Sequence, residues 1–108
     1  MITQAQLIAP TALPAAAGTQ LTVPVNTTMR IARAGFSNPT AGAIAVTAYL
    51  VASGGSPSSA NVLINGQVVA AGSTYVSPEL AGLVMPAGST LQCLGAGLVL
   101  YASGVSIQ

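Results

Sequence analysis

The sequence has almost no charge. Among 108 residues there are two arginines and one acidic residue, and histidine is absent. Charged side chains therefore make up 3% of the chain, against roughly 25% in an ordinary globular domain. A net charge of +1 cannot neutralise a row of phosphates, so we expect no binding of nucleic acid. Disordered chains combine low hydrophobicity with high charge, whereas 52% of these residues are apolar. The composition favours one folded domain.

The missing residue types also exclude most catalytic and metal chemistry. General acid–base catalysis needs a histidine or a carboxylate within reach of the substrate, and Glu79 is the single carboxylate side chain. Without histidine or aspartate the chain can build neither a Ser–His–Asp nor a Cys–His site. Zinc and calcium sites need several ligands that are also lacking. We predict that the chain is not an enzyme and holds no cofactor and no metal.

One cysteine and no long apolar run are present. The single Cys93 excludes an internal disulfide, and its alternation with Leu91 predicts a buried, inert thiol. Mean hydropathy is high, at +0.74, but a spanning helix needs about 18 consecutive apolar residues. The best window, residues 80–102, is interrupted by Pro86 and several polar residues. We therefore expect no association with a membrane.

The chain does contain short alternating runs of apolar residues. Ile44–Val51 is the clearest, since every second side chain is aliphatic over eight residues. Further strands are expected at Gln20–Val23, Thr27–Phe36, Asn61–Ile64, Gln67–Ala70, Thr74–Ser77, Leu80–Met85, Leu91–Gly95 and Leu98–Ser103. Between two of them, Asn65-Gly66 predicts a hairpin turn, because this dipeptide accepts positive φ. The pattern predicts an all-β fold, an antiparallel β-sandwich of jelly-roll type, over residues 19–108.

Residues 1–18 differ in character from the rest. Pro10 and Pro14 fix local φ and remove backbone donors. We expect an extended N-terminal arm here, with a short strand at residues 4–9, that lies along a neighbouring subunit or adds a strand to its sheet.

The sequence contains a short internal repeat. Residues 23–30, Val-Pro-Val-Asn-Thr-Thr-Met-Arg, align with residues 85–92, Met-Pro-Ala-Gly-Ser-Thr-Leu-Gln, and residues 70–75 repeat a shorter version. Either one turn chemistry is used repeatedly, or two related halves pack face to face.

Low charge points to an assembly. Free monomers protect exposed sheet edges with lysines and other charges, which this chain lacks, so we expect a homo-oligomer, with a trimer favoured. Arg30 and Arg33 have an odd separation, which places them on opposite faces of a strand unless a bulge intervenes. Glu79 is either a solvated surface carboxylate or the partner of an arginine across a subunit contact. The candidate subunit and partner contacts are Ile2, Leu7, Ile8, Leu13, Arg30, Arg33 and Glu79.

Three tyrosines have two possible roles. If Tyr49, Tyr75 and Tyr101 converged, they would form a platform for a sugar, as in a carbohydrate-binding β-sandwich module. Otherwise each is buried with its hydroxyl at a rim.

The order of turns and strands resembles that of small virion structural proteins of tailed bacteriophages. The resemblance begins with the turn and strand of residues 21–31 and continues through Phe36-Ser37-Asn38-Pro39-Thr40 and the strand of residues 45–51. It extends to the closing segment at residues 99–105, and so covers about residues 20–106. It implies a β-sandwich subunit located on the virion, with no enzymatic residues. We expect a capsid decoration (cement) protein whose partner is the major capsid protein or another virion protein, or else a neck, collar, tail or head-fibre component.

Overall fold

A computed structural model describes the backbone of residues 2–108 and the side chains from residue 6 onward. This part of the chain forms nine strands and no helix that is long and apolar enough to cross a membrane. The strands are β1 (Ile2–Ala12), β2 (Gly18–Thr22), β3 (Thr28–Ser37), β4 (Ile44–Val51), β5 (Val62–Val69), β6 (Thr74–Val76), β7 (Val84–Met85), β8 (Thr90–Leu94) and β9 (Val99–Ile107).

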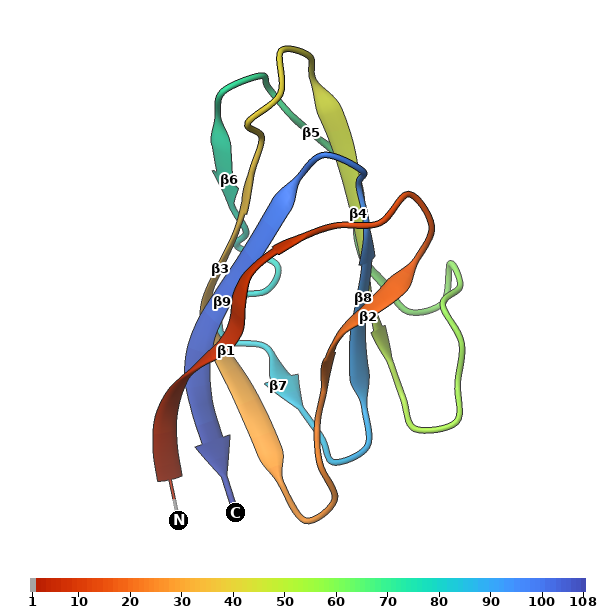
Figure 1. The fold of residues 1–108 in the computed structure, drawn as a ribbon. Helices are drawn as coiled ribbons and strands as arrows, with labels where there is room; N and C mark the ends of the chain where they lie inside the picture. The colour runs from red at the N-terminus through yellow and green to blue at the C-terminus, as the bar shows by residue number, and fades with distance from the viewer. Residues whose placement is uncertain (1) are drawn as a thin grey trace.

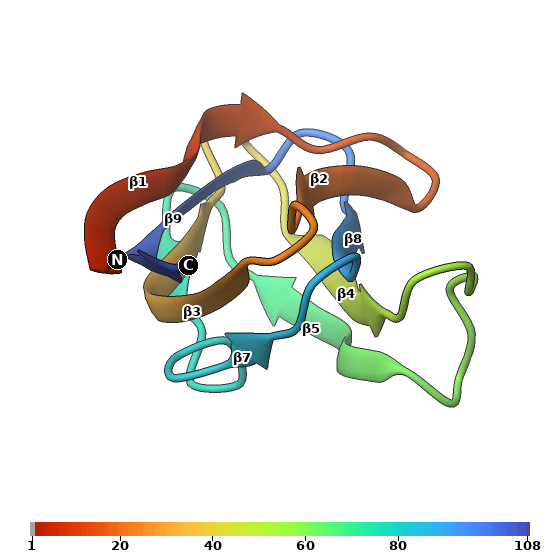
Figure 2. The ribbon, with the colours of Figure 1, turned by 90° about the horizontal axis from the view of Figure 1, so that it is seen from below.

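The strands form two antiparallel sheets that pack face to face (Figures 1 and 2). The five-stranded sheet has the order β1-β9-β3-β6, with β7 also paired to β3, and the four-stranded sheet has the order β2-β8-β4-β5. The first half of the chain thus pairs with the second half in reverse order: β1 with β9, β2 with β8, β3 with β6 and β7, and β4 with β5. A long hairpin rolled up in this way is a jelly roll. The predicted fold class, an antiparallel β-sandwich, is confirmed.

The core fills the space between the sheets. Along β9, Leu100 and Ala102 point inward and are buried, while Tyr101 and Ser103 point outward. This alternation follows from the period of two residues in a strand. The largest fully buried side chains include Phe36, Ile31, Ile64, Leu80, Met85, Leu91, Leu98 and Leu100. Each such side chain stabilises the fold by about 1.5–3 kcal/mol relative to exposure.

The predicted hairpin turn at Asn65-Gly66 is wrong, because β5 runs through it without reversing. Gly66 has a φ of 70°, whereas Asn65 does not adopt positive φ, and a two-residue turn of type I′ requires it at both positions. Val46 pairs with Gln67 and Ala48 with Ile64, so the dipeptide contributes one extra residue to β5. The glycine therefore forms a β-bulge, in which a single positive φ is sufficient.

The start of the described chain pairs with a strand of the same subunit. Within this chain, residues 2–12 form the edge strand β1, paired with β9 along its length. The register shifts twice, between Gln6 and Ile8 and between Ile8 and Thr11. The second shift accommodates Pro10, which is tolerated because an exposed edge strand does not need its backbone donor.

The two longer copies of the internal repeat form neighbouring connections between the sheets. One connection leads from β2 to β3 and the other from β7 to β8, and Asn26 and Gly88 have positive φ at matching positions, 60° and 81°. The Val23 N–H donates to the Ser89 carbonyl, and the Gly88 N–H donates to the Val23 carbonyl, both at 2.9 Å. Each sheet contains strands from both halves of the chain, so the alternative of two halves packed face to face is wrong. One turn chemistry is used repeatedly.

Candidate interaction surface

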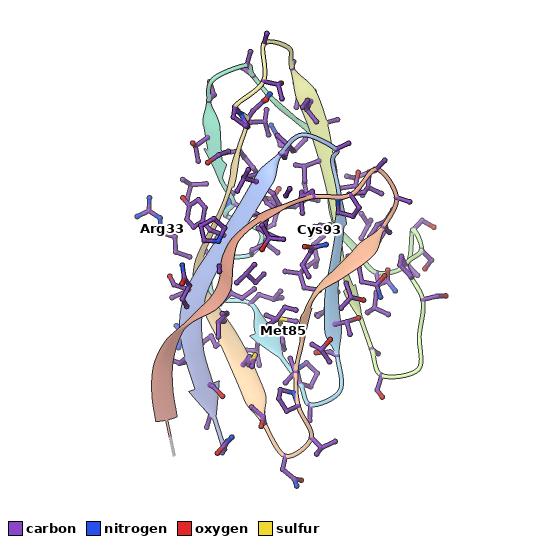
Figure 3. All side chains as sticks on the ribbon, viewed as in Figure 1. Arg33, Met85 and Cys93 are labelled. Carbon is purple, nitrogen blue, oxygen red and sulfur yellow. The ribbon has the colours of Figure 1, made fainter. Side chains whose placement is uncertain are left out.

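A β-bulge brings the two arginines to the same face of the sheet. Ile31 pairs with Gly104 and Arg33 with Ser103, so β3 holds one extra residue, Ala32, between them. The bulge shifts the alternation, and both Arg30 and Arg33 are exposed. Figure 3 shows Arg33 pointing away from the four-stranded sheet. Of the two arrangements that the sequence left open, the structure has the one with a bulge.

Two glycines permit close packing around this bulge. A Cβ added to Gly104 would collide with the Arg30 carbonyl oxygen and would lie 3.0 Å from the Ala32 nitrogen. A Cβ at Gly35 would lie only 2.7 Å from Cε1 of Tyr101, whose ring therefore covers this glycine. At position 104 only glycine leaves room for the β3 backbone, whereas at position 35 a larger residue would displace the Tyr101 ring.

Apolar side chains flank Arg30 on both neighbouring strands. Arg30 lies between Val84 of β7 and Val105 of β9, its partners in the two strand pairs. Val84 is 55% exposed, and Val76 and Ile107 on the same sheet are 46% and 39% exposed. We call this outward surface of the five-stranded sheet the arginine face; it consists of Arg30, Arg33, Val76, Val84, Val105 and Ile107.

Glu79 lies beside this sheet, in the loop between β6 and β7. Its Oε1 accepts hydrogen bonds from the hydroxyls of Tyr75 (2.6 Å) and Ser77 (3.1 Å). The Tyr75 hydrogen bond lowers the pKa of Glu79. Burial, and then the carboxylate, raises the pKa of Tyr75 to about 12. The hydroxyls of its own chain thus hold this carboxylate.

Neither arginine has such a partner. Among the described side chains, those of residues 6–108, none forms a hydrogen bond or an ion pair with the guanidinium of Arg30 or Arg33. The face therefore presents two positive charges that no described side chain of the subunit neutralises.

The apolar residues expected to contact partners are placed differently. Ile8 and Leu13 are 4% and 5% exposed and belong to the subunit's own core, because β1 completes the sandwich. Leu7 is half-buried and packs against that core. The backbone of Ile2 pairs with Ile107, but its side chain lies outside the described part of the structure. Ile8 and Leu13 are thus buried within the subunit, and the expected role of the seven residues as subunit and partner contacts stays a prediction.

The three tyrosines do not form a common platform. Tyr49 lies on β4 of the four-stranded sheet. Tyr75 stacks on Phe36 in the five-stranded sheet, with ring centroids 6.5 Å apart and an interplanar angle of 22°. Tyr101 covers Gly35 on the opposite face of the five-stranded sheet. The second expected role, partial burial of each ring, agrees better with this arrangement.

Cys93 is fully buried between the sheets (Figure 3), as expected. Burial raises the pKa of its thiol to about 12, so the reactive thiolate is disfavoured at neutral pH. Residues 2–108 contain no group of three or more histidine, cysteine, aspartate or glutamate side chains that could hold a metal ion.

The sequence analysis did not predict that the apolar residues of the arginine face are exposed. The sequence does contain one indication of the bulge that forms this face. Apolar residues occupy positions 29, 31, 34 and 36, so the period of two breaks between Ile31 and Ala34. A break of this kind is what a one-residue bulge produces.

Comparison with known proteins gives little further information. No family model matches the chain, and no curated protein matches it. The chain is similar to a solved structure described as that of infectious bursal disease virus Gx strain, with 12% sequence identity and a TM-score of 0.47. The match covers 98% of this chain and 32% of the other, so this chain spans about a third of the length of that protein.

Proposed function

We propose that this chain is a structural subunit of a virus particle, a decoration protein that binds the outer capsid shell of a tailed bacteriophage as a homo-oligomer. The observation that carries the proposal is the arginine face, on which Val76, Val84 and Ile107 are exposed at separate positions of one sheet. Apolar surface of this kind, in a chain with three charged side chains, favours association over life as a free monomer. The subunit's role is structural and not catalytic.

Two features of the sandwich support assembly. β1 ends the five-stranded sheet, and the described sheet edges carry no lysine, the residue that commonly prevents edge-to-edge pairing. Strand addition at β1 would join identical subunits, with a closed trimer favoured. The arginine face would remain available for the major capsid protein.

The copy number of the chain in purified particles tests this proposal. Quantitative mass spectrometry would compare it with the copy number of the major shell protein. Copies similar in number to the shell protein support a decoration protein on the capsid lattice. A few copies per particle would assign the chain instead to the neck, collar, tail or a head fibre, and its absence would overturn the virion role.

Light scattering tests the oligomer separately. A trimer mass at micromolar concentration supports the proposed assembly. A protein that stays monomeric and dissolved at high concentration would contradict it.

A further inference from the structure

We propose that the arginine face binds a segment of a partner protein that carries two carboxylates flanked by apolar side chains. The carboxylates would pair with Arg30 and Arg33, and the apolar side chains would pack on Val84, Val105 and Ile107. The identity of the partner as the capsid shell protein rests on the proposed function. The chemistry of the segment rests on the geometry of this face.

The spacing of the guanidiniums suits an extended acidic segment. The β9 partners of Arg30 and Arg33 are Val105 and Ser103, two residues apart and therefore about 7 Å apart along the strand. Carboxylates at alternate positions of an extended peptide have the same separation. Each guanidinium can hold a carboxylate by two parallel hydrogen bonds, and the valines beside Arg30 strengthen the attraction by excluding water.

A second copy of this chain does not fit the arginine face. Two copies meeting through this face would bring four guanidiniums together, and each copy supplies one carboxylate side chain, Glu79, which Tyr75 and Ser77 already hold. Like charges placed together at an interface cost several kcal/mol.

Nucleic acid does not fit either. Two arginines neutralise at most two phosphates, and phosphate contacts supply most of the affinity of such complexes. The four-stranded sheet has no charged residue at all, so no second patch could extend the contact. An acidic protein segment needs only the two charges that are present.

A peptide titration on the whole protein tests the chemistry. The probe is the blocked peptide Val-Glu-Val-Glu-Val, with Val-Gln-Val-Gln-Val as its uncharged counterpart. Binding is measured from changes in the amide NMR chemical shifts of the protein. We expect the glutamate peptide to change the amide resonances of residues in β3, β7 and β9. It should bind about tenfold more tightly than the glutamine peptide, which is the preference expected for one charge-assisted pair. Equal binding of the two peptides, or no binding, would overturn the proposal.

Variants locate the site. The double variant R30Q/R33Q should lose the preference for the glutamate peptide, and R30K/R33K should keep part of it. Gln67→Ala, an exposed substitution on the other sheet, should bind as the parent does. Because both arginines are exposed and have no partner among the described side chains of residues 6–108, R30Q/R33Q should keep the parent circular dichroism spectrum and Tm. Inorganic phosphate that competes as well as the glutamate peptide would contradict recognition of a protein segment.

Rebinding to particles separates this inference from the proposed function. Parent protein and R30Q/R33Q are added to particles from which the chain has been stripped. Rebinding of the parent and loss of at least tenfold in affinity for the variant supports both proposals. Equal rebinding overturns the inference alone. If neither binds while the peptides are still distinguished, the capsid function fails and the carboxylate site stands.

Discussion

Asn38 is a buried polar residue whose side chain joins two segments of the fold. It is 2% exposed, and its Nδ2 donates to the carbonyls of Gly42 (2.8 Å) and Val69 (2.9 Å). Its Oδ1 accepts from the backbone N–H (3.0 Å) and the hydroxyl (2.6 Å) of Thr40. One amide thus connects the β3–β4 loop with the end of β5. The sequence indicated a turn here but not its burial.

Replacing this amide tests its contribution. Asn38→Ala leaves the Gly42 and Val69 carbonyls without these donors, and a buried polar group left unsatisfied costs about 1–3 kcal/mol. We expect the free energy of unfolding in urea to fall by about 2–4 kcal/mol. The matched control is Asn65→Ala at an exposed position, which should change it by less than about 0.5 kcal/mol. Similar values for the two variants would contradict the assigned role.

Gly104 gives a second test at the same scale. Gly104→Ala would place a methyl group against the Arg30 carbonyl in the β3 bulge, and overpacking of this kind costs about 1–3 kcal/mol. Gly42→Ala is the control, because a Cβ there meets no atom within 4 Å. We expect Tm to fall only for the first variant, and an unchanged Tm for Gly104→Ala would show that the strands can separate at the bulge without cost.

At the scale of elements, β-bulges decide which side chains face outward. The bulge at Ala32 turns Arg33 to the same side as Arg30, and the bulge at Gly66 keeps β5 in one sheet. In both cases the residues were visible in the sequence, but the partner strand sets the register. A bulge is a mismatch between two strands, so one strand alone does not define it.

Deletion of residues 1–12 tests the role of β1. The strand pairs with β9 and places Ile8 in the core, and loss of a buried isoleucine side chain alone costs about 2–5 kcal/mol. We expect the free energy of unfolding in urea to be lower for the truncated chain by at least that amount. This loss does not depend on whether the chain forms an oligomer. The point variant Ile8→Ala should show part of the loss. A truncated chain as stable as the parent would contradict a structural role of β1 within the subunit and favour an arm that serves a neighbouring subunit.

For the whole molecule, the composition predicts an unusual pH profile. The pKa of Glu79 is lowered from 4.5, so its contribution to stability is present above that value and is lost as the pH falls through the lower pKa of the folded state. The pKa values of Tyr75 and Cys93 are raised from 10.0 and 9.0 to about 12. Their contributions are complete below about pH 9 and are lost as the pH rises toward 12.

Thermal unfolding followed by circular dichroism checks this profile. Because the chain has no histidine, Tm should stay level between about pH 5 and 9, apart from small effects of the chain termini, and fall on both sides. Tyr75→Phe should make the fall of Tm at acid pH smaller, because it removes the hydrogen bond that lowers the pKa of Glu79. A steep change of Tm near pH 6.5 would contradict these assignments.

The sequence by itself determined the fold class, most strand positions and the burial of Cys93, because alternation and turn residues act over a few neighbouring positions. It also determined which residue types are missing, since composition does not depend on folding. Only the tertiary structure decided that β1 belongs to the subunit's own sheet, that Asn65-Gly66 is a bulge, and that Arg30 and Arg33 share a face. Each of these depends on which strand lies alongside, and in a jelly roll that partner is often more than fifty residues away, as Ser103 is from Arg33.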